Sequence, residues 1–117
     1  MDIRVKRVYE APSSADGMRI LVDRLWPRGL TKEKAHVDLW LKELAPSTAL
    51  RKWFNHDPEK WEEFQQRYAQ ELRQQPAALE RLSKLIDSEP ATLLFGSKEE
   101  RFNDAMALKA FMLARDK

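Results

Sequence analysis

The sequence contains no cysteine, only three glycines and only two histidines in 117 residues. The absence of cysteine excludes disulfides, zinc sites built on thiolates and cysteine nucleophiles. His36 and His56 each lack a second metal ligand at the helical spacing of four residues, so we expect no metal site. No stretch matches a Walker or G-x-G-x-x-G nucleotide motif, and we therefore expect no cofactor.

Long apolar runs are also missing. No segment approaches the roughly 18 apolar residues that cross a membrane, and the N-terminal residues do not resemble a secretory signal. We therefore expect a cytoplasmic protein that does not interact with a membrane.

Charge of either sign is abundant, but it is balanced. The 21 basic and 19 acidic residues are interleaved along the chain and leave a formal net charge of +2. That excess is too small for a protein that coats nucleic acid, so a preference for anions must come from local clusters. One such cluster lies between Arg19 and Lys34, where five basic residues stand against two acidic ones.

Three segments have the pattern of β-strands. Residues 3–9 alternate apolar and basic side chains, which indicates a half-exposed or edge strand. Residues 19–25 and 91–95 are mostly continuous apolar runs, which are typical of strands covered on both faces. Residues 37–44 fit either a strand or a helix, and the alternation across 37–41 favours a strand.

Helix signals fill the rest of the chain. Thr31 is placed to cap a short turn through Lys34, and Ser47 to cap a helix that carries Leu50, Trp53 and Phe54. Asp57 and Pro58 predict the start of the next helix, and Pro76 that of another. The apolar stripes of these two helices are Trp61, Phe64, Tyr68 and Leu72, and Leu79, Leu82, Leu85 and Ile86. Ser97 and Glu100 have the form of a capping box before a last helix over 102–113.

This order of elements predicts a single α/β domain over residues 1–117. We expect a small, mostly parallel sheet of three to four strands covered by helices, in a Rossmann-like three-layer arrangement. Ligands of such sheets bind at the carboxyl ends of the strands. The ends of the two buried strands are therefore the first places to look for a site.

Both strand ends carry basic residues. The first is followed by DRLWPRG (23–29) and the second by Gly96, Ser97 and Lys98. If the strands are parallel neighbours, these loops share one edge of the sheet. Arg24, Arg28 and Lys98 would then hold one phosphate or carboxylate. The Ser97 hydroxyl and the first amides of the last helix would assist them.

Other residues near the predicted anion site are candidates for chemistry, and several site residues also have a purely structural explanation. Asp23 is a candidate base, His56 a candidate acid-base group beside Asp57, and Trp26 a wall of the pocket. Helix capping alone would explain Ser97 and Asp57. Ion pairs with neighbouring charges would explain Asp23 and Arg24. The helical spacing of Trp61, Phe64 and Tyr68 is typical of a core rather than of a base-stacking surface.

Several segments resemble the YeaO-like proteins, small bacterial proteins within DUF488, a larger family of unknown function. The matching segments are VDRLWPRG (22–29), LWLKELAPS (39–47), LRKWF (50–54), HDPE (56–59), WEEF (61–64) and RY (67–68). The resemblance implies a compact α/β domain in the bacterial cytoplasm, with no established activity.

The same resemblance bears on single residues near the end of the chain. Relatives usually have a lysine, an acid and then His-Asn after the last strand, where this chain has Lys98, Glu99, Phe102 and Asn103. It thus implies ligand-binding roles for Lys98 and Asn103 and no histidine chemistry. More distant members carry a cysteine here, so a shared covalent mechanism is not expected.

Three functions are compatible with these features. The first is an enzyme or sensor for a small anionic ligand, and we rank it above the others. The second is a nucleic-acid or protein-binding accessory that uses the basic stretch 19–34 and the Arg4, Lys6 and Arg7 face of the first strand. The third is a domain whose charged strand ends are only structural.

Overall fold

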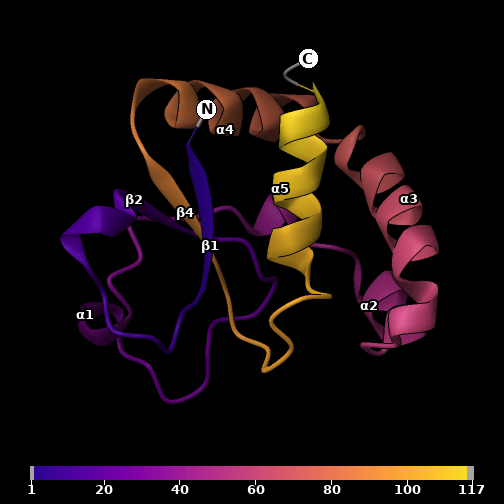
Figure 1. Ribbon diagram of the computed structural model, residues 1–117, viewed down its shortest axis with the longest axis horizontal. Coiled ribbons are helices and arrows are strands. Elements are labelled where there is room, and N and C mark those ends of the chain that lie inside the picture. Colours follow the sequence, from indigo (N-terminus) through magenta and orange to yellow (C-terminus); the bar gives the residue numbers. More distant parts are fainter. Residues whose placement is uncertain (1, 116–117) are drawn as a thin grey trace.

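The computed structural model describes residues 2–115 and contains one four-stranded sheet in the order β1-β4-β2-β3 (Figure 1). The strands are β1 (Ile3–Arg7), β2 (Met18–Leu21), β3 (Leu39–Trp40) and β4 (Ala91–Phe95). Every pairing is parallel. The predicted α/β fold is confirmed, with the first strand at an edge and the two buried strands side by side in the centre.

Two predicted strands end early. β2 ends at Leu21 rather than at residue 25, although the Val22 amide still donates to the Leu94 carbonyl at 3.2 Å. Side-chain bonds made by Asp23 and Trp40 then turn the chain away from the sheet. β1 ends at Arg7, two residues short of the predicted end. The ambiguous segment 37–44 is a strand only over Leu39–Trp40, and a 3₁₀ turn follows over Lys42–Leu44.

The helices follow the predicted order. They are α1 (Lys32–Ala35), α2 (Thr48–Phe54), α3 (Trp61–Leu72), α4 (Pro76–Ser88) and α5 (Asp104–Arg115). Thr31 and Ser47 accept hydrogen bonds from the first turns of α1 and α2, as predicted. Asp57 caps a 3₁₀ turn over Pro58–Lys60 that leads directly into α3.

The predicted capping box of the last helix is wrong. Helix α5 begins at Asp104, and Asn103 is its cap, because its side-chain oxygen accepts from the Met106 amide at 2.9 Å. Ser97 lies in the preceding loop, where its hydroxyl donates to the Glu99 carbonyl at 3.3 Å. Residues 96–103 therefore form a loop between β4 and α5.

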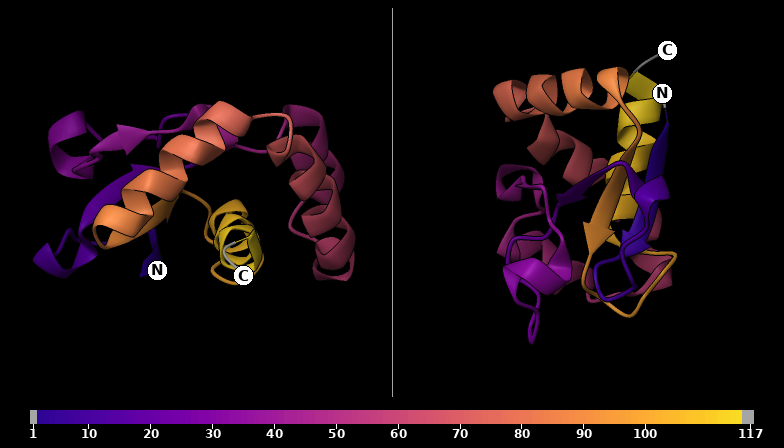
Figure 2. Two further views of the ribbon diagram at one scale, coloured as in Figure 1. Left: turned by 90° about the horizontal axis from the view of Figure 1, so that it is seen from above. Right: turned by 90° about the vertical axis from the view of Figure 1, so that its left-hand side faces the viewer.

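The two faces of the sheet are covered differently. Ile20 and Leu93 point into the main core, which is built with α2, α3, α4 and α5. Leu21 and Leu94 point to the other face, where α1 and the half-buried Trp26 and Trp40 cover them. Helix α1 and the pair of α2 and α3 lie at opposite ends of the molecule (Figures 1 and 2).

Candidate functional site

The two central strand ends meet through Asp23. Its Oδ2 accepts a hydrogen bond from the Gly96 amide at 2.7 Å, which joins the loop after β2 to the loop after β4. A Cβ at position 96 would lie only 3.1 Å from that same oxygen, so glycine permits the close approach. The predicted neighbourhood of the two loops is confirmed by this bond and by the pairing of β2 with β4.

Arg24 and Trp26 turn towards the β3 side. The Arg24 guanidinium donates to the carbonyls of Ala45 and Pro46 at 3.4 and 3.3 Å. It lines a cavity of about 310 Å³ with other polar groups, among them Glu43, Ser47, Glu71 and Gln75. The Trp26 indole donates to the Leu30 carbonyl at 2.7 Å and packs edge-on against Trp40. The Trp26 side chain thus stabilises the loop that contains it and does not form a free wall of a pocket.

Arg28 lies towards the opposite edge strand. The Tyr9 hydroxyl, just beyond β1, donates to the Arg28 carbonyl at 2.9 Å. The loop after β2 therefore has one end, at Arg24, bonded near β3 and the other, at Arg28, bonded near β1. The predicted set of Arg24, Arg28 and Lys98 is therefore divided, because Arg24 lies on the β3 side and Arg28 on the β1 side.

Arg7 connects Tyr9 to the second loop. Its Nε donates to the Ser97 carbonyl at 2.8 Å, and its guanidinium carbon lies 5.1 Å from the centre of the Tyr9 ring. Arg28 and Lys98 thus flank one tethered unit of Arg7 and Tyr9. We call Arg7, Arg28 and Lys98 the basic corner. In the sequence, Arg7 stands out only as one of the basic residues of the first strand, because nothing in the alternation indicates its contact with Ser97.

The nitrogens of the basic corner are largely unpaired. Arg28 and Lys98 are exposed, and no ion pair or hydrogen bond within residues 2–115 uses their side-chain nitrogens or the two η nitrogens of Arg7. Two nearby carboxylates already accept from backbone amides: Glu10 from Arg7, and Glu99 from Arg101 and Phe102. The corner therefore keeps unpaired hydrogen-bond donors for a ligand.

An acidic pair lies beside this edge of the sheet. Desolvation and the neighbouring Asp23 raise the pKa of Asp104, the first residue of α5, well above its usual range. Burial, with Asp104, Asp23 and Glu71 nearby, also raises the pKa of Tyr68, whose hydroxyl donates to the Leu44 carbonyl. Asp104 was not predicted from the sequence, because no local pattern shows that it meets Asp23.

Asn103 and Phe102 have structural partners, whereas His56 is exposed. Asn103 is buried, and its side-chain amide donates to the Glu99 carbonyl at 2.8 Å. Phe102 packs edge-on against Trp61 with ring centres 5.4 Å apart. His56 is exposed, and no hydrogen bond or ion pair among residues 2–115 joins it to Asp23. The two candidate catalytic residues are thus not brought together by a direct bond.

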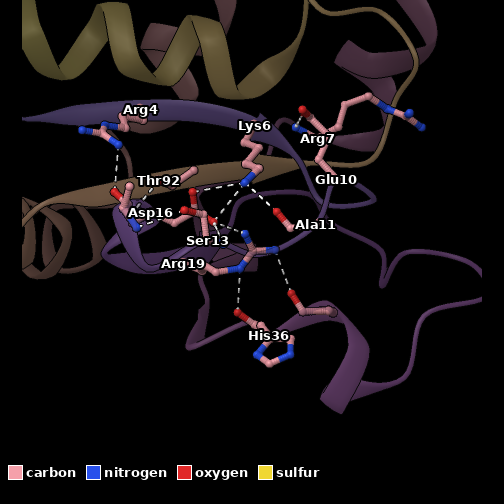
Figure 3. Close-up of polar contacts among 12 residues, drawn as sticks. Arg4, Lys6, Arg7, Glu10, Ala11, Ser13, Asp16, Arg19, His36 and Thr92 are labelled. Carbon is pink, nitrogen blue, oxygen red and sulfur yellow. Dashed lines mark hydrogen bonds and ion pairs between the residues drawn. The ribbon is translucent and has the colours of Figure 1, made fainter.

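A buried ion cluster occupies the second face of the sheet (Figure 3). Arg19 pairs with Asp16 at 2.6 Å and also donates to the carbonyls of Ala35 and His36. Lys6 pairs with the same carboxylate at 3.2 Å. Desolvation opposes the charge of Asp16, but hydrogen bonds from Ser13, Arg19 and Lys6 outweigh it and lower the pKa of Asp16.

This cluster removes two cations from the surface. Arg19 and Lys6 belonged to the basic stretch and the strand face that suggested nucleic-acid binding. Arg4 donates to the Ala15 carbonyl and also lies 3.9 Å from Asp2. Within the part of the chain that the structure describes, no cluster of three His, Cys, Asp or Glu residues fits a metal ion, and no helix is long and apolar enough to cross a membrane.

The chain is similar to a described protein family and to several bacterial proteins. The family described as the inactive DUF488-N3 subclade matches residues 2–117. The uncharacterised protein YeaO of Escherichia coli K12 is 43% identical over 108 residues, which cover 92% of this chain and 94% of the relative. The uncharacterised proteins Rv3073c of Mycobacterium tuberculosis and Mb3100c of Mycobacterium bovis are each 40% identical over 113 residues, 97% of this chain and 95% of theirs. No solved structure matches significantly.

Proposed function

This chain belongs to the inactive DUF488-N3 subclade, and from that premise we propose that it binds a small phosphate or carboxylate ligand without transforming it. The proposed site is the basic corner of Arg7, Arg28 and Lys98. Such a domain acts as a sensor or carrier of the ligand. The proposal assigns no chemical step to Asp23 or His56, because Asp23 is engaged by the Gly96 amide and no direct bond joins the two.

One observation carries the proposal: the guanidinium of Arg7 is fixed but not saturated. Its Nε donates to the Ser97 carbonyl and its guanidinium carbon lies 5.1 Å from the centre of the Tyr9 ring, while no hydrogen bond within residues 2–115 uses its η nitrogens. A guanidinium in a fixed orientation loses little side-chain entropy when it binds two oxygens of an anion. Arg28 and Lys98 add two charges from loops whose backbones are tethered to the same unit.

The nucleic-acid alternative has less support. Two of its cations, the buried Arg19 and the half-buried Lys6, are already paired with Asp16. Three cations at one corner are a small footprint for a polyanion, which is held by many phosphate contacts along its length. A small ligand needs only the corner itself.

Thermal unfolding in the presence of candidate anions tests the proposal. The ligands are inorganic phosphate, pyrophosphate, sugar phosphates, nucleotides and di- and tricarboxylates. A ligand at a hundred times its dissociation constant stabilises the folded protein by about 2.7 kcal/mol, which is easily measured. We expect at least one phosphate or carboxylate to do so.

Variants locate the binding. Arg28→Gln and Lys98→Met are expected to reduce the stabilisation. Lys32→Met is the control, because Lys32 is an exposed lysine of α1 outside the basic corner. Equal stabilisation of all three variants, or none of the wild type by any anion, would contradict the proposal.

A further inference from the structure

The cavity beside Arg24 contains charges of both signs. It has a volume of about 310 Å³ and lies between the segment that precedes α2 and the last turns of α3. The buried Ala45, Tyr68 and Leu72 form its floor, whereas the exposed Arg24 and Glu43 stand at its mouth. None of these residues belongs to the basic corner, so a ligand of this cavity is independent of the anion site.

The guanidinium of Arg24 is only weakly engaged. Its hydrogen bonds to the carbonyls of Ala45 and Pro46 measure 3.4 and 3.3 Å, beyond the ordinary range of about 2.7–3.2 Å for N–H···O bonds. Its Nη1 has no hydrogen-bond partner within residues 2–115, and no ion pair there joins it to a carboxylate. Arg24 therefore keeps charge and donors for a carboxylate group of a ligand.

Two carboxylates share the cavity with this guanidinium. Glu71 accepts from the Ser47 amide at 2.7 Å and from the Ser47 hydroxyl at 2.6 Å, which fixes its carboxylate in the wall. A carboxylate has about four acceptor positions, so Glu71 can accept further bonds. The Glu43 carboxylate has no hydrogen bond within residues 2–115, and no cation there forms an ion pair with either glutamate.

This arrangement suits a small molecule that carries both charges. A simple anion at Arg24 would also approach two carboxylates, and a simple cation at the carboxylates would approach Arg24. We propose that the cavity binds a free α-amino acid. Arg24 binds the carboxylate of the amino acid, and Glu43 and Glu71 bind its ammonium group, whose three donors can serve two acceptors. Each charge of the ligand then meets the opposite charge of the cavity.

The side chain of the amino acid has room beside this position. A second cavity of about 550 Å³ shares Ser47, Glu71 and Gln74 with the first, so the two hollows adjoin. An amino acid held by its charged groups in the first cavity can extend its side chain towards the second. The probes must therefore include amino acids with side chains of all sizes.

Thermal unfolding of the full chain with each of the standard L-amino acids tests the proposal. Acetate and methylammonium, which carry one charge each, are the control ligands. We expect at least one amino acid to raise the melting temperature and both control ions to leave it unchanged at the same concentration. Stabilisation by no amino acid, or equal stabilisation by acetate or methylammonium, would overturn the proposal.

Modified ligands assign each charge to a residue. The amino acid that stabilises the protein most is compared by calorimetric titration with its N-acetyl derivative, which lacks the ammonium group, and with its amide, which lacks the carboxylate. Arg24→Gln should weaken the binding of the amino acid at least about tenfold and leave that of the amide unchanged. Glu43→Gln should weaken the amino acid by a similar factor and leave the N-acetyl derivative unchanged.

Two further variants serve as matched controls. Arg81→Gln in α4 and Glu62→Gln in α3 remove exposed charges that do not line the cavity, and both should bind the amino acid as the wild type does. The unchanged modified ligand shows that Arg24→Gln and Glu43→Gln keep the cavity intact. Equal weakening of all three ligands by either variant, or wild-type affinity of both for the amino acid, would contradict the assignment.

Discussion

The Nε of Arg7 donates a hydrogen bond of 2.8 Å to the carbonyl of Ser97, so a side chain of the first strand fixes the loop after the last strand. The same guanidinium lies over Tyr9, whose hydroxyl holds the Arg28 carbonyl at 2.9 Å. Two strand-end loops are thus tethered to one edge strand. This arrangement gives the basic corner a defined geometry.

Loss of the Asp16 charge should destabilise the fold. Asp16→Asn leaves the buried Arg19 and the half-buried Lys6 without their carboxylate, and we expect the free energy of unfolding to fall by about 3 kcal/mol at neutral pH. Urea unfolding measures this loss. Asp87→Asn, at an exposed position of α4, is the matched control and should change little.

Acid should remove the same contribution from the wild type. Because the pKa of Asp16 is lowered by folding, its stabilisation is complete above the unfolded value of about 3.9 and disappears as the pH falls through the lower folded value. The difference between wild type and Asp16→Asn should therefore shrink below about pH 4. A constant difference down to the lowest accessible pH would contradict this assignment.

The cap of α5 can be tested by a pair of variants. Asn103→Ala removes the oxygen that accepts from the Met106 amide and should cost about 1 kcal/mol of stability. Ser97→Ala removes only a hydroxyl bonded within the loop at 3.3 Å and should stay within about 0.5 kcal/mol of the wild type. Thermal unfolding of both distinguishes the observed cap from the one predicted by the sequence. A larger effect at Ser97 would favour the predicted cap.

The stability of the wild type should fall as the pH rises through the titration of Asp104. Folding raises the pKa of this group, so the native state binds more protons than the unfolded state in the window between the ordinary value and the raised one. Asp104→Asn does not titrate and should be less dependent on pH there, and more stable than the wild type at the alkaline end. Urea midpoints measured across the window test this order, and parallel pH curves for the two proteins would refute it.

Much of the fold could be predicted because its signals are local. The apolar runs, the caps at Thr31 and Ser47 and the proline at the start of α4 each act over a few residues. The end of β2 could not be predicted, since the apolar residues continue to Leu25 while bonds from Asp23 and Trp40 turn the chain. The capping box at Ser97 and Glu100 failed because Asn103, which also fits a cap, lies next to the helix.

In the candidate site, too, the local features could be predicted and the long-range contacts could not. The sequence predicted that the loops at Asp23 and Gly96 share one edge if their strands are parallel neighbours, and the pairing of β2 with β4 meets that condition. The directions of the side chains could not be predicted: Arg24 turns to the carbonyls near β3, and Arg19 is drawn into a buried pair with Asp16. Arg7 gains its role from a bond to Ser97, far away in the sequence, and the pKa of Asp104 is raised by the charge of the equally distant Asp23.

The most direct test of the anion site is calorimetric titration of inorganic phosphate into the wild type, Arg7→Lys and Arg24→Lys. Arg7→Lys keeps the charge but loses the planar fork and its bond to Ser97, whereas Arg24 lies towards β3. We predict that the wild type and Arg24→Lys bind phosphate alike and that Arg7→Lys binds at least about tenfold more weakly, or 1.4 kcal/mol. Equal affinity of Arg7→Lys and the wild type, or a loss confined to Arg24→Lys, would contradict a site at the basic corner.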